Sequence, residues 1–150
     1  MSVYSELQDV TLRPLFLILA VAALASGCTG NATAPSQSPS FSSTDLIVGT
    51  GATAGSANTL TVNYTGWLYD STKSDFKGLQ FDTTAGGTPF QFTLGSNQVI
   101  QGWEQGLPGM KEGGVRRLIV PSSLAYGGQR SGKIPPNAAL VFDIQLITVQ

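Results

Sequence analysis

The stretch Val-Ile-Gln-Gly-Trp-Glu-Gln-Gly, residues 99–106, decides how the rest of the chain must be organised. Apolar residues recur here at the spacing of one helix face: Val99, Ile100, Trp103 and Leu107. We expect Ser96 or Asn97 to cap the start of this helix, and Gly106 with Pro108 to end it. So short a helix is not stable alone in water, so a larger element must support it. Its tryptophan is then either part of a core or the floor of a pocket.

Composition excludes several kinds of function. The 150 residues suffice for one domain with an appendage. Eight basic and nine acidic residues, without a basic cluster, argue against a nucleic-acid partner. The absence of histidine excludes Ser-His-Asp and Cys-His catalytic pairs and histidine metal sites. The single cysteine, Cys28, excludes an intrachain disulfide and a thiolate cluster. We expect no metal and no cofactor.

Residues 1–28 are predicted to be an export signal. Their apolar core, residues 15–25, is about eleven residues long, which is too short for a helix that spans a bilayer. Small residues then lead directly to Cys28, and this arrangement resembles the lipobox of bacterial lipoproteins, in which the cysteine is acylated. The alternatives are an ordinary cleaved signal followed by an unrelated cysteine, or a start site placed upstream of the true one.

The lipobox resemblance implies an exported protein, held in the cell envelope by a lipid on Cys28. Thr29 follows the cysteine instead of the aspartate associated with inner-membrane retention, so we expect the periplasmic side of the outer membrane. Residues 29–44 are rich in small polar residues and proline, and such a segment buries too little apolar area to fold. We therefore expect a flexible tether between the anchor and a folded domain.

The folded domain is predicted to comprise residues 45–150. Short segments with strand-like alternation or apolar runs are expected to form its strands: 45–48, 60–68, 90–94, 115–120 and 140–146. Gly66 marks a bulge or a close approach inside the second of them. Five strands and one helix without a βαβ rhythm predict an α+β fold with an antiparallel sheet.

Seven motifs in order carry a family resemblance: Val62-Asn63-Tyr64-Thr65-Gly66, Phe81-Asp82, Pro89 to Gly95, Val99 to Glu104, Ala125-Tyr126-Gly127, Ile134 to Asn137 and Leu140 to Asp143. Together they resemble the FKBP-type peptidyl-prolyl isomerases, the tacrolimus-binding immunophilins. The resemblance covers residues 45–150 and implies a curved antiparallel sheet wrapped around the short helix. It also implies a pocket between the helix, the concave face of the sheet and the loops.

The resemblance assigns roles to individual positions of this pocket. Trp103 forms the floor, and apolar walls come from Tyr64, Phe90, Val99, Ile100 and Phe142. Phe81 and Asp82 lie at one side, while Tyr126 and Ile134 lie on the loop across the entrance. The Tyr126 hydroxyl and the region of Ile134 would hold the substrate backbone. Among these we expect Tyr64, Asp82, Phe142 and Tyr126 to act in catalysis and the others to bind substrate.

Other residues have simpler explanations. Phe92 is expected to pack beneath the sheet as core, and Asp143 can be explained as a solvated strand position. Asp82 either acts on the substrate or orients the pocket, and the residues leave both roles open. The chain departs from compact family members in a longer segment at residues 70–80 and in Lys133 before Ile134. Both features can change which peptides fit.

The function predicted from this resemblance is peptidyl-prolyl cis-trans isomerisation of exported proteins. No nucleophile is needed, because an apolar pocket can favour the twisted amide over the planar one. Proline-containing polypeptides are the expected partners, tacrolimus-like macrolides the expected inhibitors, and a monomer the expected state. The alternatives are a peptide-binding chaperone with the same pocket but little catalysis, or an interaction protein whose acylated end matters most.

Overall fold

The computed structural model describes residues 38–150. The predicted signal segment, the predicted acylation site Cys28 and most of the predicted tether lie outside the described residues. The elements in chain order are β1 (Ser42–Ile47), β2 (Thr59–Tyr69), β3 (Lys77–Thr83), β4 (Phe90–Thr93), α1 (Gln101–Gly106), β5 (Val115–Val120), the 3₁₀ turn η1 (Ser122–Leu124) and β6 (Leu140–Val149). In this part of the chain no helix is long and apolar enough to cross a bilayer.

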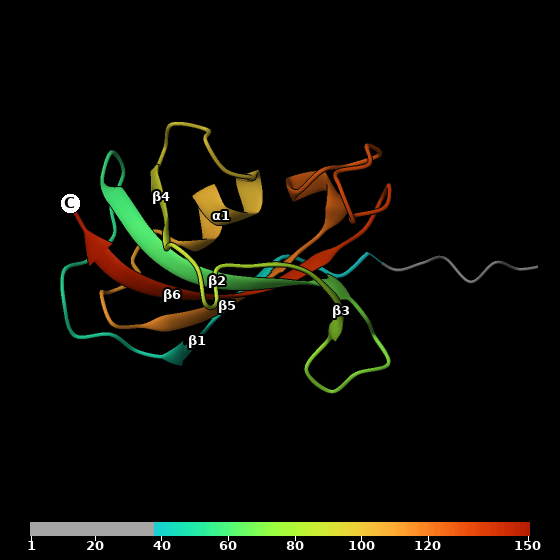
Figure 1. Cartoon of the computed structure of the whole chain (residues 1–150), viewed down its shortest axis with the longest axis horizontal. Helices are drawn as coiled ribbons and strands as arrows, with labels where there is room; N and C mark the ends of the chain where they lie inside the picture. The colour runs from blue at the N-terminus through green and yellow to red at the C-terminus, as the bar shows by residue number, and fades with distance from the viewer. Residues whose placement is uncertain (1–37) are drawn as a thin grey trace, which may run out of the picture. The chain divides into compact units, whose positions relative to one another are not determined.

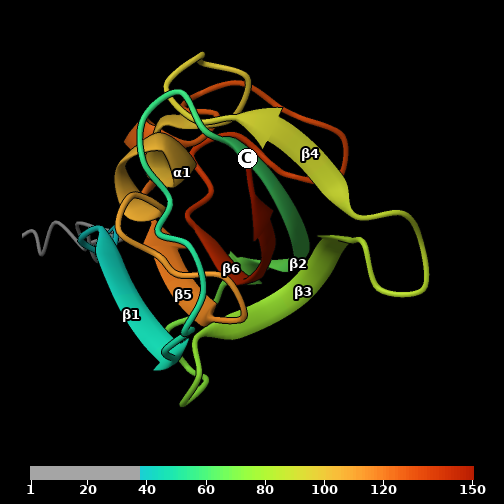
Figure 2. The same cartoon turned by 90° about the vertical axis from the view of Figure 1, so that its left-hand side faces the viewer.

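The strands form one antiparallel sheet in the order β1-β5-β6-β2-β3, with β4 pairing to β2. The sheet is curved, and α1 lies on its concave side (Figures 1 and 2). The predicted α+β class with an antiparallel sheet around one short helix is confirmed. The sheet has six strands where about five were expected.

The core lies between the concave face and α1. Alternate residues of β2 and β6 point into it, as the period of two in their sequences predicts. The residues of these two strands that are no more than 1% exposed include Leu60, Val62, Leu140, Ile144 and Leu146. From the helix side, Trp103 is 4% exposed and Leu107 is 1% exposed. This continuous apolar layer holds a helix that is too short to be stable alone.

Two glycines allow α1 to approach the sheet. A Cβ atom on Gly102 would lie 2.4 Å from Val120 Cγ1, and one on Gly106 would lie 2.6 Å from Leu118 Cδ2. The buried Arg116 then satisfies the end of the helix, because its Nη1 donates to the carbonyl of Gly106 at 2.7 Å. The guanidinium places a positive charge where the helix dipole is negative.

Three local predictions were wrong. Strand β3 was missed, because its sequence Lys77–Thr83 alternates only from Leu79 to Asp82 and its pairing with β2 is interrupted by irregularities. Strand β1 begins at Ser42, so the end of the segment predicted to be a tether is part of the sheet. The N-cap of α1 is Ile100 without a side-chain hydrogen bond, and neither Ser96 nor Asn97 caps the helix.

The loop before α1 is held from within the helix instead. The Glu104 carboxylate accepts hydrogen bonds from the backbone N–H of Gly95 at 2.6 Å and of Asn97 at 2.9 Å. The side chain of Gln98 accepts from the N–H of Thr93 at 2.8 Å, which ties the same loop to β4. The segment that leads to Val99 and Ile100 therefore has a fixed course.

Candidate active site

A pocket of about 440 Å³ opens between α1, the concave face of the sheet and the loop between β5 and β6. Its lining consists of Tyr64, Phe81, Asp82, Phe90, Gln98, Val99, Ile100, Trp103, Ala125, Tyr126 and Phe142. The structure thus brings together every residue predicted for the pocket except Ile134. That side chain is 3% exposed and belongs to the core, although its loop reaches the pocket at Tyr126.

The inner end of the pocket is aromatic. The Trp103 ring has centroid distances of 5.1 Å to Tyr64 and 5.4 Å to Phe142, both in edge-to-face geometry. Phe90 is 38% exposed at the rim, with its centroid 6.3 Å from that of Trp103. Phe92 is buried as expected for a core residue, but it packs against Trp103 at 5.7 Å, on the helix side of the sheet.

Edge-to-face contacts between aromatic rings stabilise this arrangement in addition to the burial of the rings. The rings therefore form a defined apolar surface. In the part of the chain that the structure describes, the buried Nε1 of Trp103 has no hydrogen-bond partner.

Two hydrogen bonds hold Asp82, the acidic residue of the pocket lining. The Tyr64 hydroxyl donates to Asp82 Oδ2 at 2.5 Å, and the backbone N–H of Thr83 donates to Asp82 Oδ1 at 2.9 Å. Burial raises the pKa of Tyr64 well above its usual range, and the bond to Asp82 raises it further. The hydroxyl therefore stays protonated at neutral pH, and it holds the carboxylate at the edge of the aromatic surface.

Strand β3 brings Phe81 and Asp82 to the pocket, and a glycine on β2 makes room for them. The Phe81 ring packs edge-to-face on Phe142 with centroids 5.7 Å apart. A Cβ atom on Gly66 would lie 2.6 Å from Phe81 Cζ and 3.0 Å from Phe142 Cε1. The register of β2 and β3 also shifts directly after Gly66. Both the predicted bulge and the predicted close approach are therefore present.

The sequence did not predict two lining residues, Gln98 and Ala125. Each is adjacent in the chain to a predicted one, Val99 and Tyr126 respectively, so proximity in sequence was the available signal. Tyr126 itself is 39% exposed and stands at the entrance. Among residues 38–150 no cluster of acidic, histidine or cysteine side chains could hold a metal ion.

The comparisons with known proteins agree with this geometry. The family model described as FKBP-type peptidyl-prolyl cis-trans isomerase matches residues 51–147. The chain belongs to the FKBP-type peptidyl-prolyl cis-trans isomerase family.

Curated relatives span the same region. The FK506-binding protein of Neisseria meningitidis serogroup A is 43% identical over 106 residues, which cover 70% of this chain and 92% of the relative. The FK506-binding protein of Streptomyces anulatus is 44% identical over 108 residues, or 70% of this chain and 82% of the relative.

Solved structures support the same fold. The crystal structure of AtFKBP13 has a TM-score of 0.63 and 33% identity, over 73% of this chain and 93% of that one. FkpA from Escherichia coli has a TM-score of 0.61 and 38% identity, over 73% of this chain and 48% of that one. The FKBP-like fold of the described domain is thus shown by sequence and by structure.

Proposed function

We propose that the domain is an active peptidyl-prolyl cis-trans isomerase that works without covalent chemistry. Rotation about an amide bond has a barrier of about 18–20 kcal/mol, because resonance is lost in the twisted state. The cis and trans forms of an X–Pro bond differ by only about 1 kcal/mol, so a catalyst needs to lower the barrier alone. A site that binds the twisted amide more tightly than either planar form is sufficient.

The observation that supports this proposal best is the pocket's combination of an aromatic surface with one carboxylate. The twisted amide has less charge separation than the planar amide, so a water-poor apolar site favours it. The proline ring would lie on Trp103, between Tyr64 and Phe142. The ring centroids of these two residues are 5.1 Å and 5.4 Å from that of Trp103. Asp82, fixed by Tyr64, would stand beside the rotating bond, and the Tyr126 hydroxyl would bind a peptide carbonyl at the entrance.

An assay of cis-to-trans isomerisation on Xaa-Pro peptides tests the proposal. We expect the purified full chain to accelerate the reaction. Tacrolimus (FK506), the ligand in the names of the curated relatives, should inhibit it. Asp82→Ala should lower kcat/KM while the circular dichroism spectrum stays that of the wild type. A folded chain that binds proline peptides but does not accelerate rotation would instead establish a binding module.

Export and membrane attachment are a separate proposal, which is supported by the sequence of residues 1–28. We infer that Cys28 is acylated and that the domain acts on exported polypeptides at the periplasmic side of the outer membrane. Incorporation of labelled fatty acid, lost in Cys28→Ser, would support the anchor, and membrane fractionation would locate it. Light scattering of the purified protein would test the expected monomer.

A further inference from the structure

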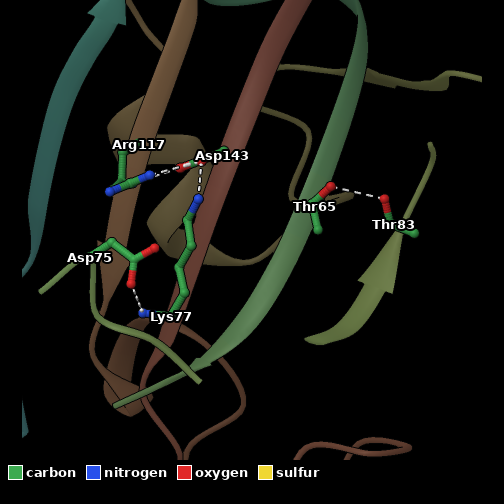
Figure 3. Close-up of polar contacts among 6 residues, drawn as sticks. All are labelled: Thr65, Asp75, Lys77, Thr83, Arg117 and Asp143. Carbon is green, nitrogen blue, oxygen red and sulfur yellow. Dashed lines mark hydrogen bonds and ion pairs between the residues drawn. The ribbon is translucent and has the colours of Figure 1, made fainter. Parts of the chain in front are cut away.

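A charged cluster lies on the convex face of the sheet, opposite the pocket. Asp143 on β6 is at its centre (Figure 3). Arg117 on β5 donates from Nε to Asp143 Oδ1 at 2.7 Å and from Nη2 to Oδ2 at 2.9 Å. Lys77 on β3 approaches the same carboxylate from the other side, with Nζ 2.6 Å from Oδ2. All three side chains are only 19–21% exposed, so solvent screens these contacts less than it screens fully exposed pairs.

Lys77 crosses β2 to reach this carboxylate. Its Nζ lies 4.1 Å from the centroid of the Trp67 ring, which is a cation–π contact. The ion pair therefore joins the edge strand β3 to β6, a strand with which β3 has no backbone pairing. The two residues are 66 positions apart in the chain.

The backbone pairing of β3 is irregular. Its pairing with β2 shifts register twice, between Gly66 and Trp67 and again between Trp67 and Tyr69. At one end the hydroxyls of Thr65 and Thr83 are 2.9 Å apart (Figure 3). At the other end Lys77 is the first residue of the strand. Its ion pair can therefore hold this end of β3, where the backbone pairing with β2 is irregular.

The turn that leads into β3 is also constrained. Asp75 Oδ1 accepts from the backbone N–H of Lys77 at 3.2 Å (Figure 3). Phe76 has a φ of 60°, in the left-handed region that bulky residues avoid, and its ring stacks on Tyr69 with centroids 5.4 Å apart. This backbone conformation persists only where its surroundings fix it. The side chain of Lys77 therefore leaves the turn in a defined direction.

Strand β3 carries Phe81 and Asp82 into the pocket, so its position sets that of the carboxylate. We propose that Lys77, through its ion pair with Asp143 on the convex face, is a positioning residue that keeps Asp82 in contact with the Tyr64 hydroxyl. The proposal rests on the proposed isomerase function for its kinetic consequence. Its structural consequence, the geometry of the bond between Tyr64 and Asp82, can be measured without turnover.

Arg117 provides a matched control. It binds the same carboxylate with a similar exposure, but β5 contributes no residue to the lining of the pocket. Lys77→Met and Arg117→Met each remove one cation from Asp143 and leave an apolar stem in place. If Lys77 acts only as a stabilising ion pair, the two variants should be alike in every measurement. If it positions Asp82, they should differ at the pocket.

The experiment compares the full-length wild type with Lys77→Met, Lys77→Arg and Arg117→Met. NMR of carbon-labelled tyrosine Cζ and aspartate Cγ atoms reports the bond between Tyr64 and Asp82. We expect Lys77→Met to shift both resonances and to lower kcat/KM about fivefold, the factor that a partly exposed ion pair can supply. Lys77→Arg should restore both readouts, and Arg117→Met should leave both unchanged. Urea unfolding will show that all four proteins are folded.

Resonances unchanged in Lys77→Met, or shifted equally in Arg117→Met, would overturn the positioning role. So would a loss of kcat/KM in Lys77→Met without any shift of the two resonances. If the wild type shows no isomerase activity, the proposed function fails, but the resonances still decide whether Lys77 positions Asp82. The two failures are therefore distinguishable.

Discussion

The two faces of the sheet are built from neighbouring residues of the same strands, yet they are held together by different forces. On β2, Tyr64 lines the pocket and Thr65 lies on the convex face; on β6, Phe142 lines the pocket and Asp143 lies on the convex face. The concave side is joined by aromatic packing around Trp103, whereas the convex side is joined by ion pairs and hydrogen bonds between strands.

The two kinds of contact contribute differently to the free energy of folding and to the positions of the strands. Burial of apolar area contributes about 25 cal/mol per Å², so the concave face supplies most of the free energy of folding. A partly exposed ion pair contributes at most about 1 kcal/mol, but it joins particular positions on two strands, here Lys77 on β3 and Asp143 on β6. Removing a whole aromatic ring from the concave face should therefore lower stability most. Removing an ion pair from the convex face should lower it less and should also change the position of the strands that the pair joins.

Phe142→Ala should have the largest effect. The ring is 4% exposed and contacts Tyr64, Phe81 and Trp103, so its removal leaves a cavity that the sheet cannot fill. We expect a loss of about 3–5 kcal/mol in the free energy of unfolding, measured in urea. Phe142→Leu is the control and should lose far less stability. A loss below 1 kcal/mol in Phe142→Ala would show that this wall is not part of the core.

Asp143→Asn should have the next largest effect, and it should depend on pH. Burial alone would raise the pKa of Asp143, but hydrogen bonds from Arg117 and Lys77 outweigh burial and lower it below the usual 3.8. A carboxylate with a lowered pKa in the folded state stabilises the protein above pH 3.8, and this contribution is lost as the pH falls through the folded-state pKa.

At pH 7 we expect Asp143→Asn to lower the free energy of unfolding by about 2 kcal/mol, since the hydrogen bonds from Arg117 and Lys77 lose their charged acceptor. Unfolding series of both proteins between pH 7 and pH 2 should show this difference shrinking below pH 3.8. The pair between Asp45 and Arg116 is present in both proteins and cancels in the comparison. A difference that stays constant with pH would contradict the assignment.

Tyr64→Phe should have a small effect on stability and a clear effect on activity. The substitution keeps the ring against Trp103 and removes only the donor to Asp82. We expect a loss of about 1 kcal/mol in unfolding free energy and a three- to tenfold lower kcat/KM. Equal activity of the two proteins would show that the carboxylate does not need this bond.

Residues whose surroundings follow from local pattern could be predicted from the sequence. The alternation along β2 and β6 placed Tyr64 and Phe142 on the face that meets the helix, and both lie there. The remaining lining residues were predicted from the family resemblance and not from composition. Ile134 was expected there because its motif matched, but the side chain turns into the core.

Features that depend on distant partners could not be predicted. Asp143 could be explained as a solvated position, because its sequence neighbourhood contains neither Lys77 nor Arg117. Strand β3 was missed because its alternation covers only Leu79 to Asp82, a signal too short to identify a strand without its partner β2. The helix cap was misplaced because Glu104, inside the helix, binds the preceding loop. In each case the tertiary contact, not the local propensity, decided the structure.

Leu79→Thr should have the smallest effect and tests how far the site extends along β3. Leu79 is 67% exposed on the edge strand, two residues before Phe81, which lines the pocket. An exposed apolar side chain contributes little to folding, so the free energy of unfolding should change by less than about 0.5 kcal/mol. With short Xaa-Pro peptides kcat/KM should equal that of the wild type, because the lining of the pocket is unaltered. A loss that appears only with longer peptides would show that substrate binding extends along β3, from the pocket toward the end of the strand at Lys77.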